Sequence, residues 1–155
     1  FGALQEDWLF EQAAEFLGPV FLVSGDQFFG GYHPFESYEG SHPKSFASQT
    51  ARWKNTKSPL IFLSGDRHLT EIIKIPGKTF GYPTYELTSS PMHAQVFADA
   101  YVKSPSPNQL VGVAGKYNYM LIEIQKTSPK RIDFRVRARG LEQATLYQRT
   151  LTVKK

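Results

Sequence analysis

A short apolar run that ends abruptly in polar residues constrains this sequence most. Residues 60–63 are Leu-Ile-Phe-Leu, and Ser64, Gly65 and Asp66 follow at once. Four consecutive apolar residues bounded by turn formers predict a short strand that is buried on both faces. Sheets that contain such strands are covered by other layers and hold their ligands at strand ends. The sequence therefore predicts a layered α/β fold with a candidate site just after residue 63.

Asp66 and His68 are the candidate chemical groups at this strand end. In extended backbone, residues two apart project to the same side. A carboxylate beside an imidazole suits a pair of metal ligands, or a base with the group that orients it. The same residues also fit a plain polar turn, in which Asp66 bonds the local backbone and His68 is half buried. The residues alone leave both interpretations open.

A second strand of the same kind precedes it. Residues 20–23 are apolar and are followed by Ser24-Gly25-Asp26, which nearly repeats residues 62–66. Pro43 can open a helix that runs to about residue 55, so the two strands flank a crossover. We therefore expect two parallel strands that deliver Asp26 and Asp66 to one edge of the sheet.

Other segments supply the layers around these strands. Residues 3–17 carry an apolar stripe at helical spacing that includes Trp8, and we expect this helix to bury Trp8 against the sheet. Residues 27–45 form a long loop with many aromatic residues, in which His33 and His42 adjoin prolines and are expected to be exposed. Further strands are predicted at residues 70–75 and 84–87, whereas residues 92–118 show no clear pattern.

Three strands are predicted late in the chain, at residues 119–125, 131–139 and 145–153. The middle one alternates strictly, with apolar residues facing one way and arginines the other. This pattern predicts an antiparallel meander with one wet face. A solvated face that discourages edge pairing is favoured over a polyanion-binding face.

Composition limits the possible functions. The chain has 155 residues, a net charge of +4 and no cysteine. The length suits a single domain over residues 1–155. The lack of cysteine excludes disulfides and thiolate metal sites, and the small net charge gives no argument for nucleic-acid binding. No apolar run reaches about 18 residues, so we expect no membrane span.

Several motifs, taken in order, resemble the PhoD-like alkaline phosphatases, a branch of the calcineurin-like metallophosphoesterases. The stretch Gly65-Asp66-Arg67-His68 resembles that family's last metal-ligand block, Gly-Asp-x-His. Three further stretches agree in order: Gln5-Glu6-Asp7-Trp8-Leu9, the Phe28-Phe29-Gly30 and Ser37-Tyr38-Glu39-Gly40 segments, and Thr88-Ser89-Ser90-Pro91.

The resemblance implies an αββα sandwich and a metal-dependent phosphomonoesterase or phosphodiesterase. It implies two metal ions (calcium, iron, zinc or manganese) held in part by Asp66 and His68, with Asp26 as a further candidate near a place where the family often has histidine. Tyr38 and Glu39 become candidate substrate contacts, with Thr88-Ser89-Ser90-Pro91 near the site. It also implies a periplasmic or secreted location.

The family's earlier metal-ligand motifs have no counterpart upstream of residue 60. The resemblance therefore implies the C-terminal half of a catalytic domain, inactive alone and completed by a missing N-terminal half. Two alternatives remain: a β-rich polyanion-binding module, and a structural protein on a non-catalytic phosphatase-like scaffold.

Overall fold

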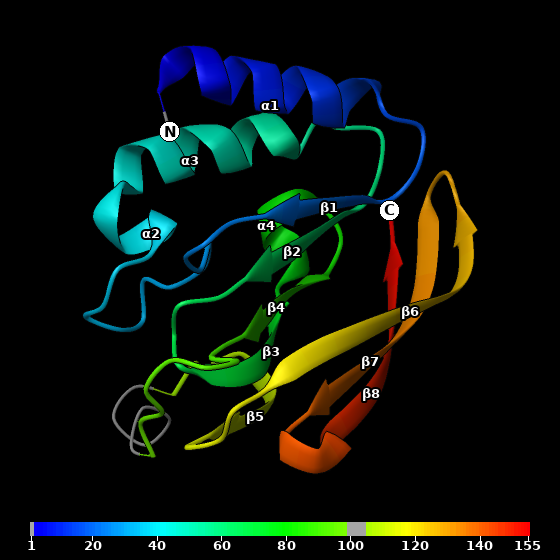
Figure 1. The fold of residues 1–155 in the computed structure, drawn as a ribbon. Helices are drawn as coiled ribbons and strands as arrows, with labels where there is room; N and C mark the ends of the chain where they lie inside the picture. Colours follow the sequence, from blue (N-terminus) through cyan, green and yellow to red (C-terminus); the bar gives the residue numbers. More distant parts are fainter. Residues whose placement is uncertain (1, 99–104) are drawn as a thin grey trace.

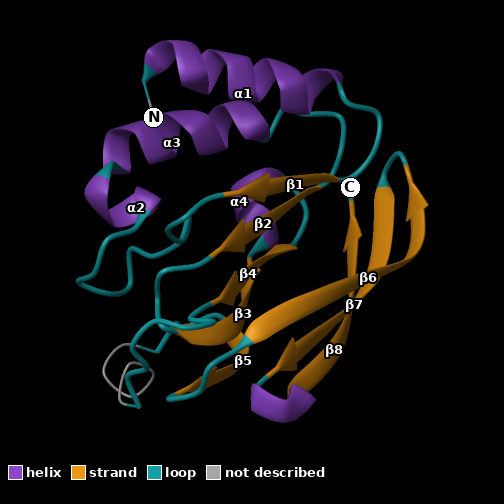
Figure 2. Cartoon of the chain, viewed as in Figure 1, coloured by secondary structure: helices purple, strands orange, loops and turns teal. Residues whose placement is uncertain are grey.

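The computed structural model describes residues 2–98 and 105–155 and contains two β-sheets, the first of which is covered by helices (Figures 1 and 2). The helices are α1 (Ala3–Glu15), α2 (Tyr38–Ser41), α3 (Pro43–Trp53) and α4 (Gly77–Phe80), with a 3-10 turn at Leu141–Gln143. The strands are β1 (Val20–Val23), β2 (Leu60–Ser64), β3 (Leu69–Ile75), β4 (Thr84–Ser89), β5 (Gln109–Ala114), β6 (Tyr119–Ser128), β7 (Arg131–Arg139) and β8 (Thr145–Lys154).

The first sheet has the strand order β1-β2-β4-β3-β5. Strands β1, β2 and β4 are parallel, and β3 and β5 run antiparallel to their neighbours. The predicted parallel pairing of the two apolar strands is confirmed, with Val20 opposite Leu60 and Val23 opposite Leu63. The expected fold class, mixed α/β with a late antiparallel meander, is likewise confirmed.

Both faces of β2 are buried, as its uninterrupted apolar sequence predicts. Leu60, Ile61 and Phe62 have no exposed surface. Phe62 meets Trp53 of α3 and Phe80 of α4, so one face packs on helices. Since side chains alternate along a strand, Ile61 faces the other way, toward the second sheet.

The second sheet, β6-β7-β8, packs its apolar face against the first. The alternation in β7 is confirmed: Ile132, Phe134, Val136 and Ala138 are each exposed by 1% or less. Phe134 contacts Phe21 of β1, and the hydroxyl groups of Thr70 and Tyr147 bond across the sheets at 2.7 Å. On the outer face, Arg137 pairs with Glu123 of the neighbouring strand, which fits the solvated face favoured from the sequence.

The helix α1 does not bury the face that its apolar stripe predicts. Trp8 is 57% exposed, and Leu4, Phe16 and Leu17 are exposed as well, whereas Ala13 is buried. The prediction of a buried Trp8 is therefore wrong. The helix rests on α3 along a different side, where Arg52 pairs with Asp7 and stacks on Phe10 (Figure 1).

Three segments escaped prediction. Strand β5 lies in the region without a clear pattern, the short helix α2 lies within the predicted long loop, and the short helix α4 fills the connection between β3 and β4. That helix ends at Gly81, whose φ of 84° lies in the left-handed region that favours glycine. No helix in the described part of the chain is long and apolar enough to cross a membrane.

Candidate functional site

The ends of β1 and β2 lie side by side, and each ends in Ser-Gly-Asp. The backbone N–H of Ser24 donates to the carbonyl of Leu63, and the N–H of Gly65 donates to the carbonyl of Gly25 at 2.9 Å. The repeated sequence thus becomes a repeated strand end, as predicted. Asp66 and the partly exposed Asp26 follow at the same edge of the sheet.

Asp66 and His68 sit in a turn rather than in extended backbone. Their φ angles are 59° and 54°, and the N–H of Arg67 donates to the carbonyl of Gly65. Positive φ is uncommon outside glycine, and such conformations gather at functional sites. The expectation of extended backbone is wrong here, because the strand stops at Ser64 and the chain turns at once. The argument that the two side chains leave on the same side therefore does not apply.

The imidazole of His68 is fixed through one ring nitrogen. Its Nδ1 bonds the carbonyl oxygen of Gln95, and its ring lies 4.9 Å from that of Phe97. A carbonyl oxygen accepts, so Nδ1 carries a proton, and in the neutral imidazole Nε2 is the nitrogen with the lone pair. Histidines that bind metal commonly hold their other nitrogen in this way. Ser90 supports the turn by accepting the backbone N–H of His68 at 2.8 Å, so the predicted closeness of this serine stretch to Asp66 and His68 holds.

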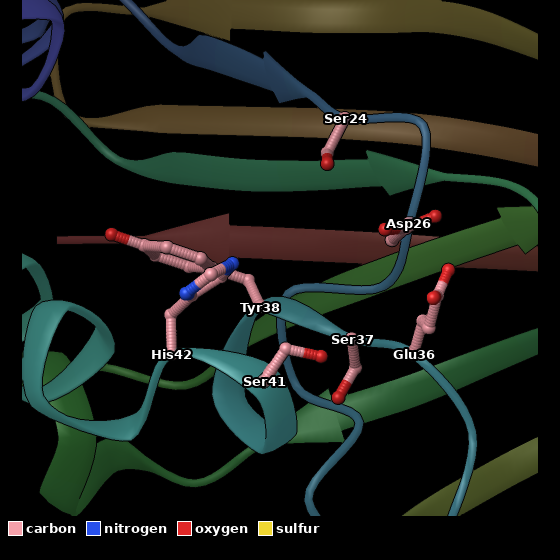
Figure 3. Close-up of a pocket in the computed structure, with 7 residues that line it drawn as sticks. All are labelled: Ser24, Asp26, Glu36, Ser37, Tyr38, Ser41 and His42. Atoms are coloured by element: carbon pink, nitrogen blue, oxygen red, sulfur yellow. The ribbon is translucent and has the colours of Figure 1, made fainter. Parts of the chain in front are cut away.

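A polar pocket of about 360 Å³ opens beside the end of β1 (Figure 3). Its lining consists of Ser24, Asp26, Glu36, Ser37, Tyr38, Ser41 and His42. The volume suits a small molecule. Two carboxylates and no lysine or arginine line it, so it favours a cation over a bare anion.

The predicted substrate contacts point to different places. Tyr38 lines this pocket, but it is 6% exposed and its hydroxyl donates to Glu6. Burial, together with the Glu6 carboxylate, raises the pKa of Tyr38 to about 12. Glu39 instead accepts the backbone N–H of Gly31 and lines a second hollow near β3.

A buried network that the sequence did not indicate ties the long loop to the sheet. The amide of Gln27, fully buried, donates to Glu71 and Thr88, each at 2.8 Å. The hydroxyl of Tyr32 also donates to Glu71 at 2.8 Å, and Gln109 donates to the other carboxylate oxygen. Glu71 is therefore held from three sides within the fold.

Glu86 anchors the same loop at a second point. Its two carboxylate oxygens accept the backbone N–H groups of Phe28 and Phe29 at 2.7 and 3.0 Å. Burial raises the pKa of Glu86 to about 7, and the two N–H donors oppose that rise without cancelling it. Glu71 and Glu86 interrupt apolar strands in the sequence, which is the signal that could have marked both as buried polar positions.

His33 belongs to this network and is buried at 7% exposure, so its predicted exposure is wrong. The N–H of Phe35 donates to Nδ1, which leaves Nε2 to donate to the amide oxygen of Gln27. Burial lowers the pKa of His33 to about 4, and the nearby charge of Arg67 acts in the same direction. His33 is therefore neutral at pH 7.

The candidate metal ligands form a partial set. Asp66 offers an exposed carboxylate and His68 an open Nε2, which are donor types that divalent ions accept. Within residues 2–98 and 105–155, no three acidic or histidine side chains group as a ligand set. A metal ion held by Asp66 and His68 would therefore need further ligands from outside any group that these residues form.

Comparison with solved structures shows which known architecture this chain resembles. A structure described as "Structure of PhoD" matches 99% of this chain with a TM-score of 0.61, at 15% sequence identity. This chain covers 33% of that one. No family model and no curated protein matches the sequence. At this identity the comparison shows that the chain shares the fold of about a third of PhoD.

Proposed function

We propose that this chain is part of a metal-dependent phosphomonoesterase or phosphodiesterase of the PhoD type. The observation that carries the proposal is the turn at residues 65–68. It places Asp66 and a tautomer-fixed His68 directly after a buried parallel strand in a PhoD-like fold. Asp66 and His68 contribute ligands, and Asp26 offers a second carboxylate at the same edge of the sheet.

The charges of the polar pocket support a bound metal ion in this proposal. Asp26 and Glu36 line the polar pocket, and their carboxylates repel a phosphate ester unless a cation lies between them. Bound divalent ions would supply Lewis acidity toward a phosphoryl oxygen and activate a water. In this proposal Tyr38 and Glu39 help to form the substrate site. Tyr38 is part of the pocket wall, and Glu39 holds the loop by accepting the backbone N–H of Gly31.

The proposal includes a partner segment that supplies further ligands. Apolar side chains lie uncovered on α1 and on the edge strand β1, with Leu4 at 88% exposure and Val23 at 72%. A hollow between them is lined by Trp8, Leu9 and Leu22, among others. This surface fits contact with another protein segment. As the span of this chain covers one third of the PhoD structure, we propose the remaining part of a catalytic domain as that segment.

Metal binding tests the proposal first. With the rest of a catalytic domain supplied, titration with manganese, calcium, zinc and iron, followed by elemental analysis after dialysis, should show a bound ion that is lost in Asp66→Asn and in His68→Ala. Matched controls are Asp7→Asn on α1 and the exposed His93→Ala, which should retain it. Equal metal content in all five proteins would contradict the assignment.

Hydrolysis tests it second. We expect no turnover of p-nitrophenyl phosphate or its diester by residues 1–155 alone, and metal-dependent turnover when the rest of a catalytic domain is supplied. Metal-dependent turnover by the lone chain, abolished by His68→Ala, would show that no partner segment is needed. A steep loss of polyanion affinity with salt and no metal binding would instead favour the polyanion-binding alternative.

A further inference from the structure

The side chain of Arg67 is buried with part of its hydrogen-bonding capacity unused. Its exposed fraction is 6%. Its Nε and Nη2 atoms are shielded from solvent, and neither has a hydrogen-bond partner among the described residues. Buried polar groups in native proteins almost always have partners, so this pair of donors requires an explanation.

The two unpartnered nitrogens share one edge of the guanidinium plane. Their N–H bonds run nearly parallel along that edge and match the spacing of two oxygens in a carboxylate or a phosphate. Nε and Nη2 are thus the pair that binds an oxyanion in the bidentate manner. Two unpartnered nitrogens that did not share an edge would not indicate bidentate binding of an oxyanion.

Among the residues that the structure describes, no acidic side chain bonds this edge of Arg67. The guanidinium lies 4.9 Å from the ring centre of Phe35 and 6.0 Å from that of Tyr32, so aromatic rings cover it. The neighbouring His33 is neutral and contributes no negative charge. The carboxylate of Glu71 lies near enough to act on Tyr32, as Arg67 does, but it accepts its hydrogen bonds from other residues.

We propose that the Nε–Nη2 edge of Arg67 binds a small oxyanion of the carboxylate or phosphate class, and that the ring of Phe35 closes this site in the present structure. Phe35 is 51% exposed and lies between α2 and β1 in a loop without regular secondary structure, so its ring turns aside at little cost in packing. This proposal needs no metal ion at Asp66 and His68, because it rests on the contacts of Arg67 alone.

Calorimetric titration with inorganic phosphate, and separately with acetate, tests the proposal in metal-free buffer at constant ionic strength set by chloride. Saturable binding of either anion is expected, and the pair shows whether the ligand is tetrahedral or planar. Arg67→Lys keeps the charge and loses the bidentate edge, so it should weaken binding at least tenfold. Phe35→Ala removes the ring that closes the site and should bind the anion at least as tightly as the parent chain, and Asp7→Asn on α1 is the control that should leave binding unchanged.

A measurement on the unaltered chain keeps the proposal testable if variants of Arg67 fail to fold. The Nε–H resonance of Arg67 in a ¹⁵N-labelled sample, assigned by its loss in Arg67→Lys or by its contacts with Phe35, should shift saturably with the anion. An unmoved resonance would overturn the proposal. So would equal anion affinity in the parent chain and a folded Arg67→Lys.

Discussion

The backbone N–H of Gly65 donates to the carbonyl oxygen of Gly25 across 2.9 Å, and this bond joins the ends of two parallel strands. A Cβ at position 65 would lie 3.2 Å from that oxygen, which is closer than ordinary contact. The missing side chain is therefore what lets the two Ser-Gly-Asp ends approach each other. The spacing between Asp26 and Asp66 depends on this approach.

Gly65→Ala should accordingly lower the free energy of unfolding by about 1–3 kcal/mol, the usual cost of overpacking. It should also weaken metal binding by moving Asp66. Gly25→Ala is the matched control, since a Cβ there meets nothing within 4 Å. Urea denaturation and metal titration of both variants check the prediction, and equal losses in the two would contradict it.

Glu86 should make stability fall as the pH rises. Its pKa in the folded chain is about 7, against an ordinary value of 4.5, so the folded state holds the proton more tightly. Between these two values the folded state binds more protons than the unfolded state, and stability decreases with pH by linkage. The full effect is of the order of 3 kcal/mol, complete above pH 7 and absent below pH 4.5.

Glu86→Gln removes this titration. The amide also turns an NH₂ group toward one of the two loop N–H donors, so the variant should be less stable overall. The diagnostic result is the flatter dependence of its unfolding free energy on pH between 4.5 and 7, relative to the parent chain. Identical slopes would show that Glu86 titrates normally.

His33 should act in the opposite direction over nearly the same range. Its pKa in the folded chain is about 4, against an ordinary value of 6.5, so the unfolded state takes up the proton first. The stability associated with neutral His33 is present above pH 6.5 and is lost as the pH falls toward 4. His33→Gln should flatten that acid-side loss, measured by urea denaturation at pH 4.5, 5.5 and 6.5. A pH dependence in His33→Gln equal to that of the parent chain would contradict the prediction.

The order of apolar and polar residues predicted the strands well, because the burial of a strand is encoded in a few consecutive residues. The apolar run at residues 60–63 requires cover on both faces, and the strict alternation in β7 requires cover on one. Each requirement is visible within five to nine residues. The end of β2 was placed correctly for a similar reason, since Ser64 and Gly65 end the apolar run.

The candidate site was less predictable because its contacts join distant positions. Glu86 holds Phe28 across 58 positions, and Glu71 holds Gln27 across 44. Nothing near His33 in the sequence reveals that Gln27 folds back onto it, so the adjoining proline suggested exposure. Backbone with positive φ at Asp66 and His68 is likewise set by the turn as a whole rather than by either residue alone.

The two tryptophans differ in burial: Trp53 lies on the packed face of α3, whereas Trp8 lies on an exposed face of α1. Trp53 on α3 has no exposed surface and meets Phe28 and Phe62, so Trp53→Ala should cost about 3–5 kcal/mol in unfolding free energy. Trp8 on α1 is 57% exposed, so Trp8→Ala should cost much less, on the order of 1 kcal/mol, in the isolated chain. Urea denaturation of both variants measures the difference.

The exposed apolar side chains of α1 are expected to affect binding of another segment rather than the unfolding free energy of the isolated chain. Trp8 lines the hollow beside Val23 on the edge strand, where we propose that another segment docks. Trp8→Ala should therefore weaken association with that segment at least tenfold, whereas Phe16→Ala, at the far end of the same helix, should weaken it less. Calorimetry with the supplied remainder of a catalytic domain compares the two. If Trp8→Ala were instead as destabilising as Trp53→Ala in the isolated chain, the exposed position of Trp8 and the docking surface built on it would both be wrong.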